Sequence, residues 1–126
     1  MDVAVPNNLK LGIDLDKQKV NNGIEPMEFN NYLSEQDIIL IDLREQNELD
    51  KIGRIKNSMR ISFPEINNFL NKNKNKLQNK RILFYCAIGQ RSTLAVKISR
   101  SYKYSKCLHL IGGLKNWIHA GLGLIK

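Results

Sequence analysis

A single cysteine stands between an apolar run and a short loop in the segment from residue 81 to residue 92. The segment reads Arg-Ile-Leu-Phe-Tyr-Cys-Ala-Ile-Gly-Gln-Arg-Ser. Its apolar run, Ile82 to Tyr85, predicts a strand buried on both faces of a parallel sheet. The residues from Thr93 to Tyr102 contain no Gly or Pro and repeat apolar side chains at helical spacing, which predicts a helix. The loop therefore lies at the carboxyl end of a strand and the amino end of a helix, where open α/β sheets bind ligands.

The residue types of this loop favour an anionic sulfur at its centre. Gly89 permits a tight ring in which successive N–H groups point inward, and the helix that begins near Ser92 adds its positive end. Free cysteine has a pKa of about 8.5, and a helix N-terminus with a nearby arginine lowers such values to roughly 3.5 to 7.5. The alternative interpretation is a small buried residue at a strand end, the usual role of a lone cysteine. We predict that Cys86 is a nucleophile and that the substrate is bound by Ala87, Ile88, Gly89, Gln90, Arg91 and Ser92.

Two further segments carry motifs that accompany the cysteine loop. One contains Asp42-Leu43-Arg44-Glu45 and then Gly53-Arg54-Ile55, and the other is Gly112-Gly113-Leu114-Lys115-Asn116-Trp117. The series D-x-R-E-x-x-E, G-x-I, C-x-x-G-x-R-S and G-G-x-x-x-W resembles the single-domain rhodanese, or thiosulfate sulfurtransferase-like, family. The resemblance extends over about residues 24 to 122, which is most of the chain.

This resemblance implies a rhodanese-like α/β fold with a central, mostly parallel five-stranded sheet flanked by helices on both faces. It also implies that the thiolate of Cys86 takes the outer sulfur of thiosulfate or another sulfane donor, releases sulfite and holds a persulfide until cyanide or a thiol removes the sulfur. The expected partners are a small sulfur-containing anion and a thiol acceptor. A sulfur-accepting protein is an alternative acceptor. No cofactor is expected.

Charged residues in these motifs allow structural as well as functional roles. The planar guanidinium of Arg91 suits an oxyanion or a persulfide, although it could equally brace the loop against a neighbouring carboxylate. Asp42 and Arg44 flank a strand end, and we interpret them as structural support. Glu45 and Glu48 follow no acid-base pattern, so we expect them on a solvated helix face.

The length of the loop separates sulfur chemistry from phosphate chemistry. Cys86 and Arg91 enclose four residues, whereas Cys-dependent phosphatases, including those with a rhodanese-like fold, enclose five. A shorter ring has a smaller anion pocket, which favours a sulfur atom over a phosphoryl group. A Cys-dependent phosphatase or arsenate reductase is therefore the second hypothesis, and a non-catalytic interaction module of the same fold is the third.

The length of 126 residues predicts one compact domain, residues 24–126, preceded by an extension, residues 1–23. The first residues lack a basic region followed by an apolar one, and no apolar run is long enough to cross a membrane, so we expect a cytoplasmic protein. The cysteine count fits a reducing compartment, with Cys107 as a buried strand residue and a weak candidate for a resolving thiol. His109 and His119 have no partner at metal-ligand spacing, so no metal is expected.

The remaining pattern alternates helices and strands. We expect helices over residues 27–33, 46–51, 65–70 and 114–119, strands over 38–43, 82–86 and 107–111, and a solvated helix end or loop over the polar tract 71–76.

Charge is distributed unevenly along the chain. Residues 1–50 contain 4 Lys and Arg against 11 Asp and Glu, whereas residues 51–126 contain 16 against 1. We interpret the basic half as a field that attracts small anions. Nucleic acid is an unlikely partner, because no aromatic residues interleave with the basic ones.

Overall fold

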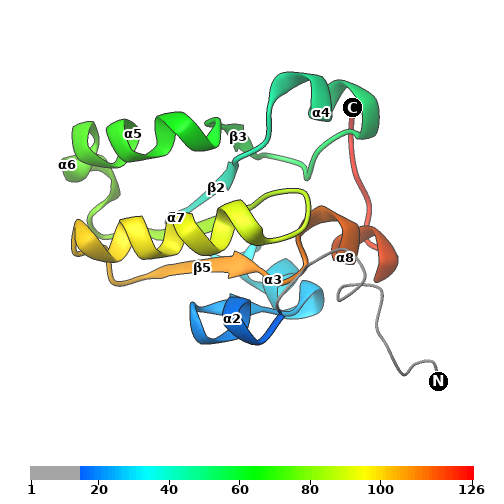
Figure 1. Ribbon diagram of the computed structural model, residues 1–126, viewed down its shortest axis with the longest axis horizontal. Helices are drawn as coiled ribbons and strands as arrows, with labels where there is room; N and C mark the ends of the chain where they lie inside the picture. The colour runs from blue at the N-terminus through cyan, green and yellow to red at the C-terminus, as the bar shows by residue number, and fades with distance from the viewer. Residues whose placement is uncertain (1–14) are drawn as a thin grey trace.

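The computed structural model describes residues 15–126, and a parallel sheet forms the centre of the molecule (Figure 1). Its strands are β1 (Gly23–Ile24), β2 (Ile38–Asp42), β3 (Met59–Arg60), β4 (Arg81–Tyr85) and β5 (Cys107–Leu110). Their order across the sheet is β1-β5-β4-β2-β3, and each neighbouring pair is parallel. The predicted five-stranded α/β sheet is confirmed, and its pairing is parallel throughout.

Helices cover both faces of this sheet, as predicted. One face packs against α5 (Ile66–Lys72), α6 (Lys74–Leu77) and α7 (Gln90–Ser101), and the other packs against α3 (Pro26–Tyr32) and α8 (Gly113–His119). The helix α4 (Gln46–Ile52) follows β2, and the short helix η1 (Phe63–Glu65) precedes α5. No helix in the described part of the chain is both long and apolar enough to span a bilayer.

The central strand β4 shows why its sequence is continuously apolar. Ile82 and Phe84 enter the core layer beneath α5, α6 and α7, whereas Leu83 and Tyr85 enter the layer beneath α3 and α8. All four side chains are fully buried. Because successive strand residues point to opposite faces, a strand that is covered on both faces needs apolar residues at every position. Cys86 directly follows this strand and joins the layer beneath α7.

Several short elements were not expected from the sequence. The strands β1 and β3 have two residues each, and the polar tract 71–76 is largely helical, since it contains the end of α5 and most of α6. Residues 15–20, within the expected extension, form the helix α2 (Leu15–Val20), which contacts β1 and α7. The part of that extension before residue 15 lies outside the described residues.

A buried ion pair lies at the carboxyl end of β2. Nε of Arg44 donates to Oδ1 of Asp42 at 3.0 Å, and Nη2 donates to Oδ2 at 2.8 Å. Nη2 also donates to the carbonyl of Gly53 at 2.6 Å, so the pair joins β2 to the segment that follows α4. Both side chains are almost completely buried, at 1% and 0% exposure. The pair thereby supports the edge of the sheet at which Cys86 lies.

We predict that Arg44→Met destabilises the protein by about 3 to 5 kcal/mol, because the carboxylate of Asp42 is left buried and unpaired. The double variant with Arg44→Met and Asp42→Asn lacks that buried charge, so it should recover part of the lost stability. Urea unfolding of the two variants and the unmodified protein measures both effects. An unfolding midpoint for Arg44→Met equal to that of the unmodified protein would contradict a structural role for the pair.

Candidate active site

The sulfur of Cys86 lies among the backbone N–H groups of the loop that leads into α7. The N–H of Gly89 donates to Sγ at 3.1 Å, and the N–H of Ser92 lies 3.4 Å from it. The hydroxyl oxygen of Ser92 is 3.7 Å from Sγ. Cys86 itself is 0% exposed, so the protein surrounds the sulfur on all sides. This arrangement suits a negative charge on sulfur, because the N–H dipoles point toward it.

The carbonyl groups of the same loop are each held by a donor. The donors are the N–H of Leu114 for Cys86, the N–H of Lys115 for Ala87, the side-chain amide of Gln18 for Ile88, and the N–H and hydroxyl of Thr93 for Gly89. These bonds fix the backbone of the loop. Of the N–H groups in the predicted ring, those of Gly89 and Ser92 point toward the sulfur.

Gly89 has a backbone that other residues adopt with strain. Its φ is 94°, in the left-handed region. A Cβ at this position would also collide with the side-chain amide of Gln18. Both features require glycine, and the expectation that Gly89 closes a tight ring agrees with this geometry.

A buried histidine orients the hydroxyl beside the sulfur. Nε2 of His109 lies 3.0 Å from the carbonyl oxygen of Gln18, which can only accept, so Nε2 carries the proton. Nδ1 is then an acceptor, and the hydroxyl of Ser92 donates to it at 2.8 Å. Burial lowers the pKa of His109 to about 4, so the ring is neutral at pH 7. No sequence motif pointed to His109, because its partners are brought together only by the fold.

Arg91 is held by Glu48 of α4. Its Nη1 and Nη2 donate to the two carboxylate oxygens at 2.9 and 3.0 Å. The expectation that Glu48 lies on a solvated helix face is wrong, since its side chain is 30% exposed and forms this pair. The hydrogen bond that Arg91 donates to Glu48 is the first cause of a raised pKa for Arg91, and burial opposes it. The charge of a Cys86 thiolate is a further cause that raises this pKa. The guanidinium thus braces the loop and also lies close enough to Cys86 to favour a negative sulfur.

The other predicted loop residues differ in exposure. Ala87 and Ile88 are half-buried, and Gln90, the first residue of α7, is exposed. Ser92 is fully buried.

Cys107 is far from Cys86. It pairs with Ile82 across the sheet, four residues before Cys86 on β4, which places the two thiols about 13 Å apart along the strand direction. A disulfide needs Cα atoms within about 7 Å. Burial raises the pKa of the Cys107 thiol to about 11. These features do not favour a resolving role.

The basic tract of α5 and α6 is also distant from Cys86. α6 leads into the amino end of β4, whereas Cys86 follows the carboxyl end, about 17 Å away for a strand of five residues. Figure 1 shows α6 at the opposite end of α7 from the Cys86 loop. Exposed charges are screened over about 8 Å at physiological ionic strength. We expected the basic residues 51–126 to attract small anions. The position of this tract does not support that expectation.

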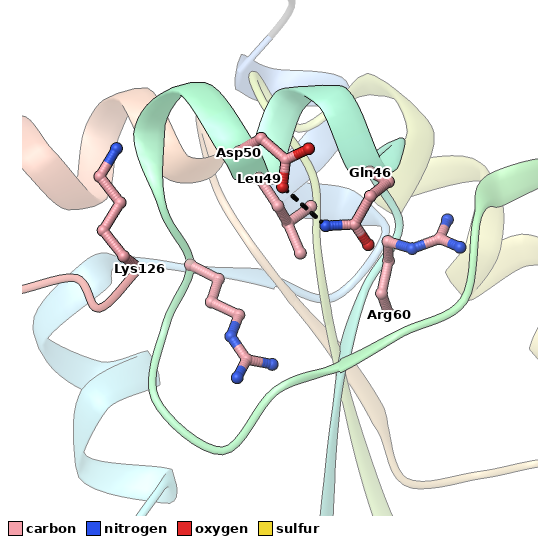
Figure 2. Close-up of a pocket in the computed structure, with 6 residues that line it drawn as sticks. Gln46, Leu49, Asp50, Arg60 and Lys126 are labelled. Atoms are coloured by element: carbon pink, nitrogen blue, oxygen red, sulfur yellow. Dashed lines mark hydrogen bonds between the residues drawn. The ribbon is translucent and has the colours of Figure 1, made fainter.

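A pocket of about 440 Å³ lies beside α4 (Figure 2), and its lining does not include the Cys86 loop. Arg60 and Lys126 stand on opposite sides of it in Figure 2. The ammonium of Lys126 donates to the carbonyl of Lys51 at 3.0 Å, and the amide of Gln46 donates to Asp50 at 2.9 Å. The side chains of Gln46 and Lys126 thus have partners within the protein. Within residues 15–126, no group of His, Cys, Asp and Glu could hold a metal ion.

We predict that Glu48→Gln lowers stability at neutral pH by about 0.5 to 1 kcal/mol. The hydrogen bonds from Arg91 lower the pKa of Glu48 below its ordinary value of 4.5. The ion pair therefore stabilises the folded protein above that value, and its contribution is lost as the pH falls through the lower pKa of the folded state. Urea midpoints measured from pH 3 to pH 8 should converge for the two proteins at the acid end. Glu28→Gln, on an exposed position of α3, is the matched control, and a constant gap at every pH would contradict the prediction.

The family model described as a rhodanese-like domain matches residues 25–120. Among curated proteins, the tRNA uridine(34) hydroxylase of Rickettsia prowazekii (strain Madrid E) is 28% identical over 120 residues, covering 93% of this chain and 47% of the relative. The chain thus spans about half the length of the curated relatives it matches.

A solved polysulfide-sulfur transferase homodimer from Wolinella succinogenes has a TM-score of 0.71 and 26% identity, covering 88% of this chain and 83% of that one. A solved protein from Rhodopseudomonas palustris, described as a possible tyrosine phosphatase, has a TM-score of 0.77 at 23% identity, covering 88% and 90%, and shows the fold alone. On the family model and the shared fold, the chain belongs to the rhodanese-like domain family.

Proposed function

We propose that the protein is a sulfurtransferase that carries sulfane sulfur on Cys86. The thiolate attacks the outer sulfur of thiosulfate or a similar donor, the S–S bond of the donor breaks, and its electron pair leaves with sulfite. Cys86 then holds a persulfide anion. A cyanide ion or thiolate attacks the outer sulfur in turn, which restores the Cys86 thiolate and completes the transfer.

The observation that carries this proposal is the N–H cradle around the sulfur. A persulfide is an anion one atom longer than the thiolate, and the donors on Gly89 and Ser92 stabilise negative charge at this place. The family membership and the likeness to a polysulfide-sulfur transferase support the same chemistry. The guanidinium of Arg91 adds positive charge while it remains anchored on Glu48.

The acceptor in this proposal is a small thiol, cyanide or the thiol of a protein. The described cysteines are free, and a cytoplasmic, reducing compartment would keep Cys86 as a thiol. No cofactor takes part in the steps above, since the cysteine itself carries the sulfur.

Phosphatase or arsenate reductase chemistry is less well supported. The ring from Cys86 to Arg91 is one residue shorter than in Cys-dependent phosphatases, and the guanidinium that would grip a phosphate is engaged by Glu48. The solved structure described as a possible tyrosine phosphatase shares the fold only.

A second candidate is modification of the uridine at tRNA position 34. The observation in its favour is the similarity to curated tRNA uridine(34) hydroxylases over 93% of this chain. Hydroxylation oxidises the uridine by two electrons, so the assay supplies dioxygen as the oxidant. Mass analysis of nucleosides from tRNA incubated with the chain under air tests the candidate, and hydroxylated uridine that disappears in Cys86→Ser would support it. If the tRNA stays unmodified with both the unmodified protein and Cys86→Ser, this second candidate function is contradicted.

We predict that thiosulfate adds one sulfur atom to the protein and that cyanide or a reducing thiol removes it. The reason is the stabilised anionic sulfur at Cys86. Intact-mass spectrometry measures the addition, and the thiosulfate to cyanide transfer rate should fall roughly a thousandfold or more in Cys86→Ser. Cys107→Ser is the matched control and should keep most activity. Equal sulfur addition in Cys86→Ser, or none in the unmodified protein, would exclude the mechanism.

We also predict that hydrolysis of para-nitrophenyl phosphate is negligible beside sulfur transfer, because the short ring leaves too little room for a phosphoryl group. Both rates are measured on the same preparation, with Cys86→Ser as the blank. Robust phosphatase activity that Cys86→Ser abolishes would reverse the order of the two hypotheses.

A further inference from the structure

The helix α2 is anchored by a polar side chain. Gln18 is 2% exposed, whereas Val20 of the same helix is 75% exposed. A buried amide needs hydrogen-bond partners, and Gln18 uses both ends of its side chain. Its Nε2 donates to the carbonyl of Ile88 at 3.1 Å, and its Oε1 accepts from the N–H of Gly112 at 2.7 Å. The amide therefore has one orientation and fixed partners on two loops.

One of these partners determines where an N–H group of the sulfur cradle points. The carbonyl of Ile88 and the N–H of Gly89 belong to the same trans peptide, so they point in opposite directions. Gln18 holds the carbonyl on one side, and on the other side the N–H lies 3.1 Å from Sγ of Cys86. The anchor on the carbonyl thus aims the N–H at the sulfur.

Gln18 differs from the other groups that hold this loop. The donors to the carbonyls of Cys86, Ala87 and Gly89 come from α7 and α8, within the matched residues 25–120. Gln18 comes from α2, before the first matched residue. The amide of Gln18 also lies close against Gly89, where an added Cβ would meet it.

We propose that Gln18 is a positioning residue of the Cys86 site, which stabilises the anionic sulfur by aiming the Gly89 N–H at it. The helix α2 is accordingly a working part of the site and not a passive extension. This inference rests on the proposed role of Cys86 as a nucleophile.

The ionisable groups near Cys86 do not change their charge over the pH range in which a thiol titrates. Arg91 on α7 has a raised pKa, and its partner Glu48 on α4 has a lowered one. His109 on β5, which reaches the sulfur through Ser92, has a pKa of about 4 and is neutral above pH 5. A change in the pH dependence of Cys86 alkylation therefore reports on the sulfur itself.

The test measures iodoacetamide alkylation of the full chain from pH 5 to pH 10, in a Cys107→Ser background that leaves one thiol. Gln18→Met removes the donor to Ile88, and the alkylation midpoint should rise by about one to two pH units, the effect of one lost hydrogen bond to a charged group. Gln18→Glu keeps an acceptor for the Gly112 N–H but repels the Ile88 carbonyl and adds negative charge. Its midpoint should rise further.

Lys19→Met, on an exposed position of the same helix, is the control and should leave the midpoint unchanged. Circular dichroism and urea unfolding show whether each variant is folded. If Gln18→Met fails to fold, the comparison is made with Gln18→Glu, because this variant retains the hydrogen bond that anchors α2 to Gly112. A folded Gln18 variant whose midpoint equals that of the control would overturn the inference.

The readout separates this inference from the proposed function. Alkylation needs no sulfur donor, so absence of persulfide in the unmodified protein would contradict the function and leave the midpoint comparison intact. Unchanged midpoints together with normal persulfide formation would contradict the role of Gln18 alone.

Discussion

The orientation of one short loop is the constraint on which the rest of the structure depends. Its carbonyl groups, from Cys86 to Gly89, each accept a hydrogen bond from a neighbouring element. Since a trans peptide unit turns its carbonyl and its N–H in opposite directions, the bond that holds the Ile88 carbonyl leaves the Gly89 N–H facing the sulfur. A negative sulfur is then stabilised by fixed dipoles that need no rearrangement when charge develops.

Separate elements tie this loop to the sheet. Arg91 connects it to α4 through Glu48, while Ser92 connects it to β5 through His109. The buried pair of Asp42 and Arg44 fixes the neighbouring end of β2 to the segment after α4. Each link pairs a polar group with a hydrogen-bond partner, which explains why a buried polar site can be stable here.

The main helices and strands could be predicted because their signals are local. The apolar run before Cys86 and the helical spacing after it place this cysteine between a strand and a helix. The strand begins one residue before the expected run, and the helix begins three residues before Thr93. Glu48 could not be assigned, because its partner Arg91 is 43 positions away. Gln18 and His109 were missed for the same reason, and α2 has only one buried side chain, so it lacks the apolar periodicity that identifies a helix. The two-residue strands β1 and β3 are too short to leave a pattern.

The most direct test of this account is the amide spectrum of the ¹⁵N-labelled protein before and after treatment with thiosulfate. If the N–H groups of Gly89 and Ser92 hold the sulfur, their proton resonances should move strongly when Cys86 becomes a persulfide, because the negative charge then moves from Sγ to the added outer sulfur. The amide of Lys103, at the far end of α7, should stay in place. Persulfide formation with the Gly89 and Ser92 resonances unmoved would contradict the central role of the loop.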